Sequence, residues 1–174
     1  MQYIGNGGST AVEEELFFQK ISAQKRRLFG IAYSYLRNQA DAVEAVQEAT
    51  CKAWMKRKHV KDAKSFDFWV TRILINVCID EQRRRKRLVL TDGYIDIKTN
   101  EMVSDSMLDV QNALAKLKPK HRHVLILKYM HDMTVPDIAL ILGKPEGTIK
   151  SWVYQGLKQL RRRMGIEEGG LNHA

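Results

Sequence analysis

The chain has 174 residues, enough for one large domain or two small ones, and 44% of them are hydrophobic, which suffices for a packed core. Its formal net charge of +9 favours a polyanionic partner such as nucleic acid. No apolar run is long enough to span a membrane and none resembles a signal peptide, so we expect a cytoplasmic protein without direct membrane insertion.

The charge is unevenly distributed along the chain. Residues 1–90 carry a net charge of +7 and residues 110–174 a net charge of +6, whereas residues 91–109 carry −4. This pattern predicts two polyanion-binding modules joined by an acidic linker. Charge alone fits a basic protein with a solvated tether equally well.

The first predicted helices follow a disordered segment, residues 1–12, which is rich in glycine and polar residues. Apolar residues then recur at helical spacing from Val12 to Leu36. Asn38 with an acid three residues on predicts an N-cap, and the helix that follows runs to about Lys58. Its polar face carries Asp41, Glu44, Gln47 and Glu48. These acids lack a histidine or a ligand loop, so an acidic docking or solvent face is favoured over a metal site.

A third long helix is predicted after the basic loop 59–64, with Ser65 as its cap and the cationic run 83–87 at its end. We expect Phe66, Trp69, Ile73 and Val77 on its inner face. Aromatic and cationic residues together suit single-stranded or distorted DNA, because bases stack while cations hold the backbone. Core packing accounts for Phe66 and Trp69 in either case.

Residues 91–109 show no sustained period and are predicted to be a linker, with a second helical block from near Asp109. Pro119 begins another helix. Thr134 is predicted to cap the next one, with Pro136 in its first turn. The stretch "DIALILGKPEGTIKSW" then has the spacing of a helix-turn-helix: a small Ala139, a glycine for a left-handed turn at 143, and an aliphatic anchor at Ile149.

The last predicted helix has two distinct faces. It buries Ile149, Val153, Leu157 and Leu160, and it exposes Lys150, Ser151, Tyr154, Gln155 and Lys158. The exposed side chains suit base edges, and the arginines at 161–163 suit phosphates. A solvated amphipathic helix whose arginines complement its C-terminal dipole fits the same residues.

The sequence contains no catalytic constellation that we recognise. Cys51 and Cys78 have no partner at metal-ligand spacing, and His121 and His123 point apart on a helix. We therefore expect a non-enzymatic protein with no metal and no cofactor. The predicted fold class is all-α, with two small helical domains joined by a flexible linker and a helix-turn-helix in the C-terminal one.

Four motifs, in this order, resemble the extracytoplasmic-function (ECF) sigma factors of the sigma-70 superfamily of bacteria. "DAVEAVQEA" resembles the helix that binds core polymerase, and "FWVTRILIN" followed by "DEQRR" resembles the helix that melts the promoter and reads the −10 element. "ALAKLKPKHRHVLIL" resembles the start of the −35-binding domain, and "DIALILGKPEGTIKS" its helix-turn-helix.

The resemblance implies a division of the chain and a set of roles. Residues 13–90 would be sigma region 2, 91–109 the acidic linker, 110–166 sigma region 4 and 167–174 a tail. Core RNA polymerase would bind Asp41, Glu44, Gln47 and Glu48. The −10 element of promoter DNA would meet Lys61, Lys64, Ser65, Arg72, Asn76, Arg83 and Arg84. The −35 element would meet Lys150, Ser151, Tyr154, Gln155 and Lys158. An anti-sigma factor, often membrane-anchored, would hold the cytoplasmic protein inactive at the inner face of the membrane.

Some positions depart from the family pattern. Thr50 stands where an aromatic residue is common, and Trp152 and Gln155 replace frequent basic residues. Gly156 replaces a frequent alanine, which costs a helix roughly 1 kcal/mol. These departures bear on the promoter sequence more than on the function.

The alternative function is a stand-alone helix-turn-helix regulator, which would bind a palindromic duplex as a dimer. A nucleic-acid-processing enzyme is disfavoured because no active site is recognisable.

Overall fold

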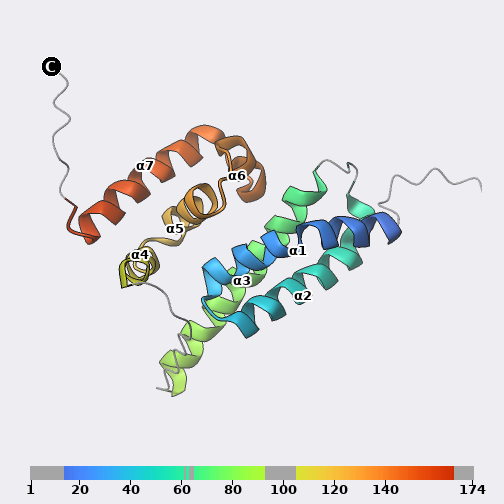
Figure 1. Ribbon diagram of the computed structural model, residues 1–174, viewed down its shortest axis with the longest axis horizontal. Helices are drawn as coiled ribbons and strands as arrows, with labels where there is room; N and C mark the ends of the chain where they lie inside the picture. Colours follow the sequence, from blue (N-terminus) through green and yellow to red (C-terminus); the bar gives the residue numbers. More distant parts are fainter. Residues whose placement is uncertain (1–13, 61, 63–64, 93–104, 167–174) are drawn as a thin grey trace, which may run out of the picture. The chain divides into compact units, whose positions relative to one another are not determined.

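The computed structural model describes residues 14–60, 62, 65–92 and 105–166, and the chain divides into two units, residues 1–96 and 97–174 (Figure 1). Within the described ranges, seven α-helices, one short 3-10 helix and one π-helical segment account for the regular structure, and no strand occurs. The all-α fold with two helical units is therefore confirmed. The predicted disordered residues 1–12 and the tail 167–174 lie outside the described residues.

Three helices form the N-terminal unit: α1 (Glu14–Leu36), α2 (Gln39–Lys56) and α3 (Phe66–Asp92). The 3-10 helix Arg57–His59 follows α2, so the predicted end of α2 near Lys58 was two residues too late. The side-chain oxygen of Asn38 accepts a hydrogen bond from the amide of Asp41 at 3.0 Å, which confirms the predicted cap. The α1–α2 connection is tight, and Arg37 within it adopts a left-handed backbone with φ 55°.

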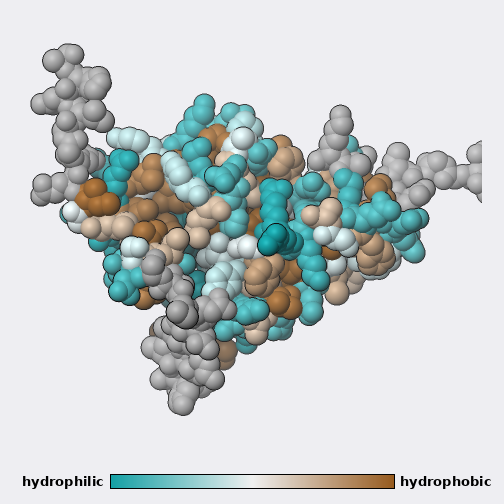
Figure 2. All heavy atoms as spheres, in the orientation of Figure 1, coloured by the Kyte–Doolittle hydropathy of each residue, from teal (hydrophilic) through white to brown (hydrophobic). Residues whose placement is uncertain are grey.

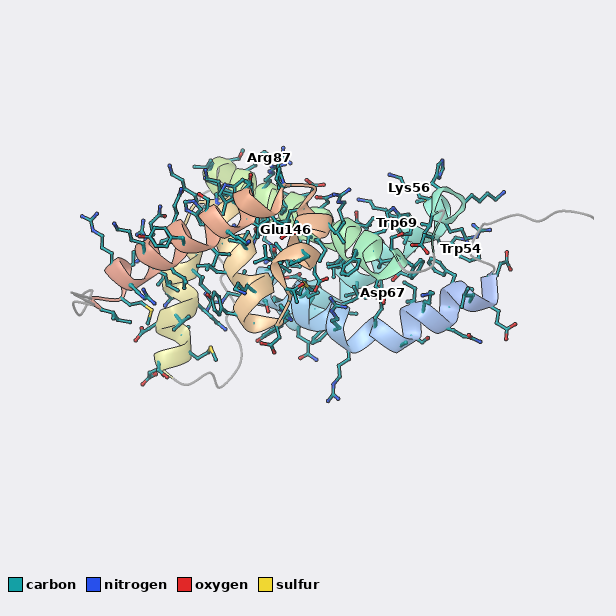
Figure 3. All side chains as sticks on the ribbon, turned by 90° about the horizontal axis from the view of Figure 1, so that it is seen from above. Trp54, Lys56, Asp67, Trp69, Arg87 and Glu146 are labelled. Atoms are coloured by element: carbon teal, nitrogen blue, oxygen red, sulfur yellow. The ribbon has the colours of Figure 1, made fainter. Side chains whose placement is uncertain are left out.

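The core of this unit contains a cluster of aromatic rings. Phe17 is fully buried, and its ring centroid lies 5.2 Å from that of Trp54 and 5.5 Å from that of Phe66. Figure 2 shows hydrophilic side chains along much of the visible surface. Figure 3 shows Trp54 and Trp69 at one end of the unit and Arg87 at the other.

The inner face of α3 differs from the prediction. Phe66 and Val77 are buried, but Trp69 and Ile73 are partly exposed. The apolar buried residues of α3 are Phe66, Val70, Leu74, Ile75, Val77 and Cys78. The difference arises because α3 packs against both α1 and α2, which requires a broad apolar face rather than the single stripe that was predicted.

The C-terminal unit contains α4 (Asp105–Ala115), α5 (Pro119–Leu125), a π-helical segment (Ile126–Met130), α6 (Val135–Leu142) and α7 (Glu146–Arg163). Thr134 caps α6 in a reciprocal box with Asp137, and Gly143 takes a left-handed backbone with φ 63°. Both features confirm the sequence prediction for the helix-turn-helix. Helix α7 packs against α4, α5 and α6.

Two ends of the predicted linker 91–109 are helical instead. Residues 91 and 92 complete α3, and residues 105–109 form the first turns of α4; residues 93–104 between them lie outside the described residues. The apolar residues Met107, Val110 and Leu114 recur at spacings of three and four, the pattern of an amphipathic helix. The acids at 105 and 109 obscured this pattern, although an acid in a first turn favours a helix.

Two glycines of α7 lie in contrasting surroundings. A Cβ on Gly147 would meet no atom within 4 Å, whereas a Cβ on Gly156 would lie 3.2 Å from side-chain carbons of Leu125 and 3.3 Å from the Cβ of His121. A side chain at position 156 would therefore require Leu125 or His121 to shift by a few tenths of an ångström, so Gly156 lies at a close approach of α5 and α7.

We expect Gly147→Ala to stabilise the C-terminal unit by about 0.4–1 kcal/mol, because alanine restricts the unfolded chain and meets open space. Gly156→Val should destabilise it by about 1–3 kcal/mol through overpacking against α5. Hydrogen exchange of the α5 and α7 amides measures both effects. Equal protection in the two variants would contradict the close approach.

Candidate nucleic-acid interfaces

A row of polar residues follows the solvent face of α3. Arg72, Asn76 and Arg83 are all exposed, and their spacings of four and seven residues place them on one side of the helix. Eleven residues separate the first from the last, a rise of about 16 Å. Ser65, which is also exposed, immediately precedes the helix on the same side, and its hydroxyl donates to the carbonyl of Asp62 at 3.0 Å. Lys61 and Lys64 lie outside the described residues.

The next arginine of α3 is oriented differently. Arg84 donates from Nε and Nη2 to the two carboxylate oxygens of Glu81, at 2.7 and 2.8 Å. Successive side chains of an α-helix point about 100° apart around its axis. Arg84 therefore does not continue the row formed by Arg72, Asn76 and Arg83. Arg83 approaches Asp80 at 3.7 Å, but both side chains are well exposed and such a pair contributes little.

The predicted polar face of α2 divides into two parts. Glu44, Gln47 and Glu48 are exposed, and Glu48 forms an ion pair with Lys52 at 2.6 Å. The Asp41 side chain is only 29% exposed, and its carboxylate forms an ion pair with Arg85 of α3. Arg85 also donates to Glu81 at 2.8 Å. Asp41 therefore links α2 to α3, a role that its sequence position did not indicate.

The carboxylate of Glu81 is the centre of this network. Hydrogen bonds from Arg84, and then from Arg85, hold the pKa of Glu81 below its usual value, against the opposing effect of burial. A carboxylate with a lowered folded-state pKa adds stability above its unfolded pKa of about 4.3 and loses that stability as the pH falls through the folded-state value.

We therefore expect Glu81→Gln to destabilise the N-terminal unit at pH 7 by up to about 1 kcal/mol. The difference from the parent should shrink as the pH falls through the lowered folded-state pKa of Glu81, because the parent carboxyl then also becomes protonated. Urea unfolding followed by fluorescence in a Trp152→Phe background measures this, because Trp54 and Trp69 then report the N-terminal unit. A difference that persists undiminished at the lower pH would contradict the lowered pKa.

The exposed face of α7 agrees with the sequence prediction. Lys150, Ser151, Gln155 and Lys158 are exposed, and Tyr154 is 70% exposed. The amide of Gln155 donates to the Ser151 hydroxyl at 3.1 Å, so these two polar groups form one hydrogen-bonded pair on the surface. The stripe presents a cation at each end and neutral hydrogen-bonding groups between them, which suits base edges flanked by phosphates.

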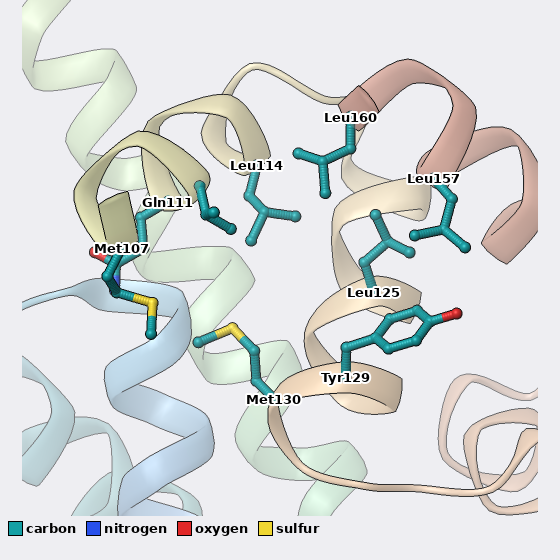
Figure 4. Close-up of a pocket in the computed structure, with 9 residues that line it drawn as sticks. Met107, Gln111, Leu114, Leu125, Tyr129, Met130, Leu157 and Leu160 are labelled. Atoms are coloured by element: carbon teal, nitrogen blue, oxygen red, sulfur yellow. The ribbon is translucent and has the colours of Figure 1, made fainter. Parts of the chain in front are cut away.

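The opposite side of α7 holds the helix in place. Ile149, Val153 and Gly156 are buried, while Leu157 and Leu160 are only partly covered. Both leucines line an apolar pocket of about 340 Å³ together with residues of α4, α5 and the π-helical segment (Figure 4). The buried His121 of α5 lies 3.2 Å, through Nδ1, from the side-chain oxygen of Gln159. The exposed stripe of Lys150, Ser151, Tyr154, Gln155 and Lys158 is thus fixed on its unit by apolar and polar contacts.

Comparison with known protein families decides what these two helical units are. Residues 21–88 match the family model "Sigma-70 region 2", and residues 107–160 match "Sigma-70, region 4". The chain belongs to the sigma-70 family and is an ECF sigma factor. The region 2 match extends from α1 to α3 of this sigma factor, and the region 4 match extends from α4 to α7.

Relatives of this sigma factor are similar over most of their length. RNA polymerase sigma factor SigV of Bacillus subtilis is 29% identical over 152 residues, which are 85% of this chain and 90% of SigV. ECF RNA polymerase sigma factor SigW of the same organism is 25% identical over 173 residues, 87% of this chain and 90% of SigW.

Two solved structures show the same fold. RpoE of Bartonella quintana, in a complex with the anti-sigma factor NepR, has a TM-score of 0.68 and 26% identity over 87% of this chain and 98% of that one. CnrH, in a complex with the cytosolic domain of CnrY, also has a TM-score of 0.68, with 20% identity over 91% of this chain and 94% of that one. At that identity CnrH supports the fold alone.

Sigma factors are initiation subunits of RNA polymerase rather than enzymes. Within the described residues, no cluster of three or more His, Cys, Asp or Glu side chains is placed to hold a metal ion. Among the same residues, no helix has the length and hydropathy needed to cross a membrane. Transcription initiation at specific promoters is the function of this family.

Proposed function

We propose that the sigma factor binds core RNA polymerase through Glu44, Gln47 and Glu48 of α2, without catalysing a reaction itself. The exposure of these three side chains supports the proposal, because an acidic and amide surface is available to a basic partner. Asp41 is a positioning residue in this proposal, since its carboxylate is engaged by Arg85.

Promoter DNA is contacted by two separate surfaces in the proposal. The α3 row of Ser65, Arg72, Asn76 and Arg83 meets the −10 element, with Lys61 and Lys64, which precede α3 in the sequence, as further contacts and Arg84 as a secondary one. The α7 stripe meets the −35 element through Lys150, Ser151, Tyr154, Gln155 and Lys158. The single observation that carries the proposal is that each unit exposes its own polar row on one long helix.

The domain boundaries follow the same division. Region 2 takes residues 13–90, and region 4 takes residues 110–166 with the α4 turns from 105 added. The proposed division keeps the acidic linker between the two regions and residues 167–174 as a segment after region 4. The fold gives each region its own core, so each can engage the promoter as a separate module.

An anti-sigma factor controls this protein in our proposal. The related RpoE was solved with the anti-sigma factor NepR, which supports a protein inhibitor for a chain of the same family and fold. A membrane-anchored inhibitor would hold the cytoplasmic sigma factor at the inner face of the membrane, as the family resemblance suggests.

Addition of the purified chain to core bacterial polymerase on a randomised promoter library tests the function. We expect transcripts whose promoters share two short elements, and none with core alone. A stand-alone regulator would instead bind a palindromic duplex as a dimer without polymerase. Failure to associate with core under any salt condition would overturn the proposal.

A further inference from the structure

An aromatic residue of α7 contacts a lysine that comes from another helix. Trp152 lies on α7, and the ammonium of Lys120, the second residue of α5, is 5.6 Å from the centroid of the Trp152 ring. A lysine ammonium within about 6 Å of a tryptophan ring is attracted to its face. Lys120 is itself exposed, so its charge stays available to a partner while the ring limits its position.

Trp152 marks one flank of the exposed stripe. Trp152 follows Lys150 by two residues, so the two side chains point about 200° apart around the helix axis. Trp152 is only partly exposed. The side of α7 next to Trp152 carries the buried residues Ile149, Val153 and Gly156. Trp152 is thus at the border between the exposed stripe and the packed side of α7.

Residues at such a border lie near the DNA backbone when a helix enters the major groove. The front of the helix faces base edges, and its flanks face the two sugar–phosphate strands. A cation on the flank therefore contacts phosphate. Position 152 of this chain carries an uncharged indole, so α7 itself supplies no cation at this point of its flank.

We propose that Lys120 contacts a promoter phosphate and that Trp152 is its positioning residue, so that α5 supplies the flank charge which position 152 of α7 lacks. The inference rests on the proposed function, in which α7 reads the −35 element. It adds a DNA contact outside the recognition helix and gives a reason for the tryptophan.

The salt dependence of promoter binding tests the charge. The full-length sigma factor is assembled with core polymerase, and the probe is a duplex promoter that this holoenzyme transcribes from the randomised library. Loss of one phosphate contact lowers the slope of log affinity against log salt by about 0.9. For Lys120→Met, the ratio of parent to variant affinity should therefore shrink about threefold between 50 and 200 mM salt.

Lys128→Met is the matched control. The ammonium of Lys128 lies 5.8 Å from the ring of Tyr129, so it is also a lysine over an aromatic ring in the same unit, but its partner belongs to the π-helical segment and not to α7. We expect the parent salt slope for this variant. An equal change of slope in both variants would overturn a specific role for Lys120.

Variants of Trp152 test the positioning role. Trp152→Ala should weaken binding less than Lys120→Met, and the double variant should bind like Lys120→Met alone, because both changes act through one contact. Trp152→Phe should retain most of the parent affinity. Trp152→Arg combined with Lys120→Met should restore the parent slope by returning a cation to the flank.

The possible failures are distinguishable. If no promoter is selected, or if the parent holoenzyme does not bind one, the proposed function is wrong and this inference is wrong with it. If the parent binds but Lys120→Met leaves the slope unchanged, only the inference is overturned. Additive effects of Trp152→Ala and Lys120→Met would overturn the positioning role alone.

Discussion

Replacing Arg72, Asn76 and Arg83 together with alanine should abolish promoter opening by the holoenzyme and leave its assembly with core polymerase intact. All three side chains are exposed on one side of α3, so their removal leaves the core of the N-terminal unit intact. A hydrogen bond to a charged group contributes about 1.5–3 kcal/mol. The loss of two such contacts alone lowers the population of opened promoter by at least about 100-fold.

A matched triple variant controls for the loss of charge. Ser22, Arg26 and Arg27 are exposed on α1 and carry the same number of cations as the α3 row. Their replacement by alanine should leave opening near the parent level. Permanganate reactivity of unpaired thymines measures opening, and co-elution with core measures assembly. Equal losses in the two triple variants would show that net charge, and not the α3 row, governs opening.

Features that depend on neighbours in the chain were predictable from the sequence. Asn38 caps α2 and Thr134 caps α6, as their spacing to an acid three residues on indicated. Gly143 takes the left-handed backbone that the helix-turn-helix requires. These interactions span three or four residues, so their geometry follows from helix periodicity alone. The exposed stripe of α7 was predictable for the same reason, because helix periodicity alone determines which residues share one face.

Features that depend on packing between helices were not predictable in the same way. The ion pair of Asp41 with Arg85, 44 residues later in the chain, was not indicated by the sequence. The inner face of α3 was assigned from one apolar period, whereas contact with two helices shifts burial to Val70, Leu74 and Cys78. Sequence periodicity describes one helix at a time and does not indicate how many partners it has.

The departures from the family pattern illustrate the same limit. Gly156 was expected only to loosen α7, and its role in the approach of α5 follows from the positions of Leu125 and His121. Trp152 was expected only to remove a charge, and the ammonium of Lys120 at its ring comes from an element that the sequence does not connect with it. In both cases the substituted residue matters through a neighbour on another helix.

Reversing Glu44 and Glu48 of α2 to lysine should abolish binding of the sigma factor to core polymerase. Both carboxylates are exposed beside Gln47, so a complementary partner surface must be basic. Lysines placed against that basic surface reduce the binding free energy by several kcal/mol, because like charges then face each other. The dissociation constant should rise at least about 100-fold, since each 1.4 kcal/mol is tenfold. The fold should survive, because breaking the Glu48–Lys52 pair within one helix costs only about 0.3–0.5 kcal/mol.

The control reverses Glu14 and Glu15 at the start of α1, which changes the net charge of the chain by the same amount. Both side chains are exposed, and within the described residues Glu14 meets Arg57 at 3.6 Å, an exposed pair that contributes little. Fluorescence anisotropy of labelled sigma factor titrated with core measures both double variants. The two double variants reverse the same amount of charge at different places on the N-terminal unit. Similar losses of affinity would mean that core polymerase responds to the overall charge of this unit. The assignment of α2 as the polymerase surface would then be wrong.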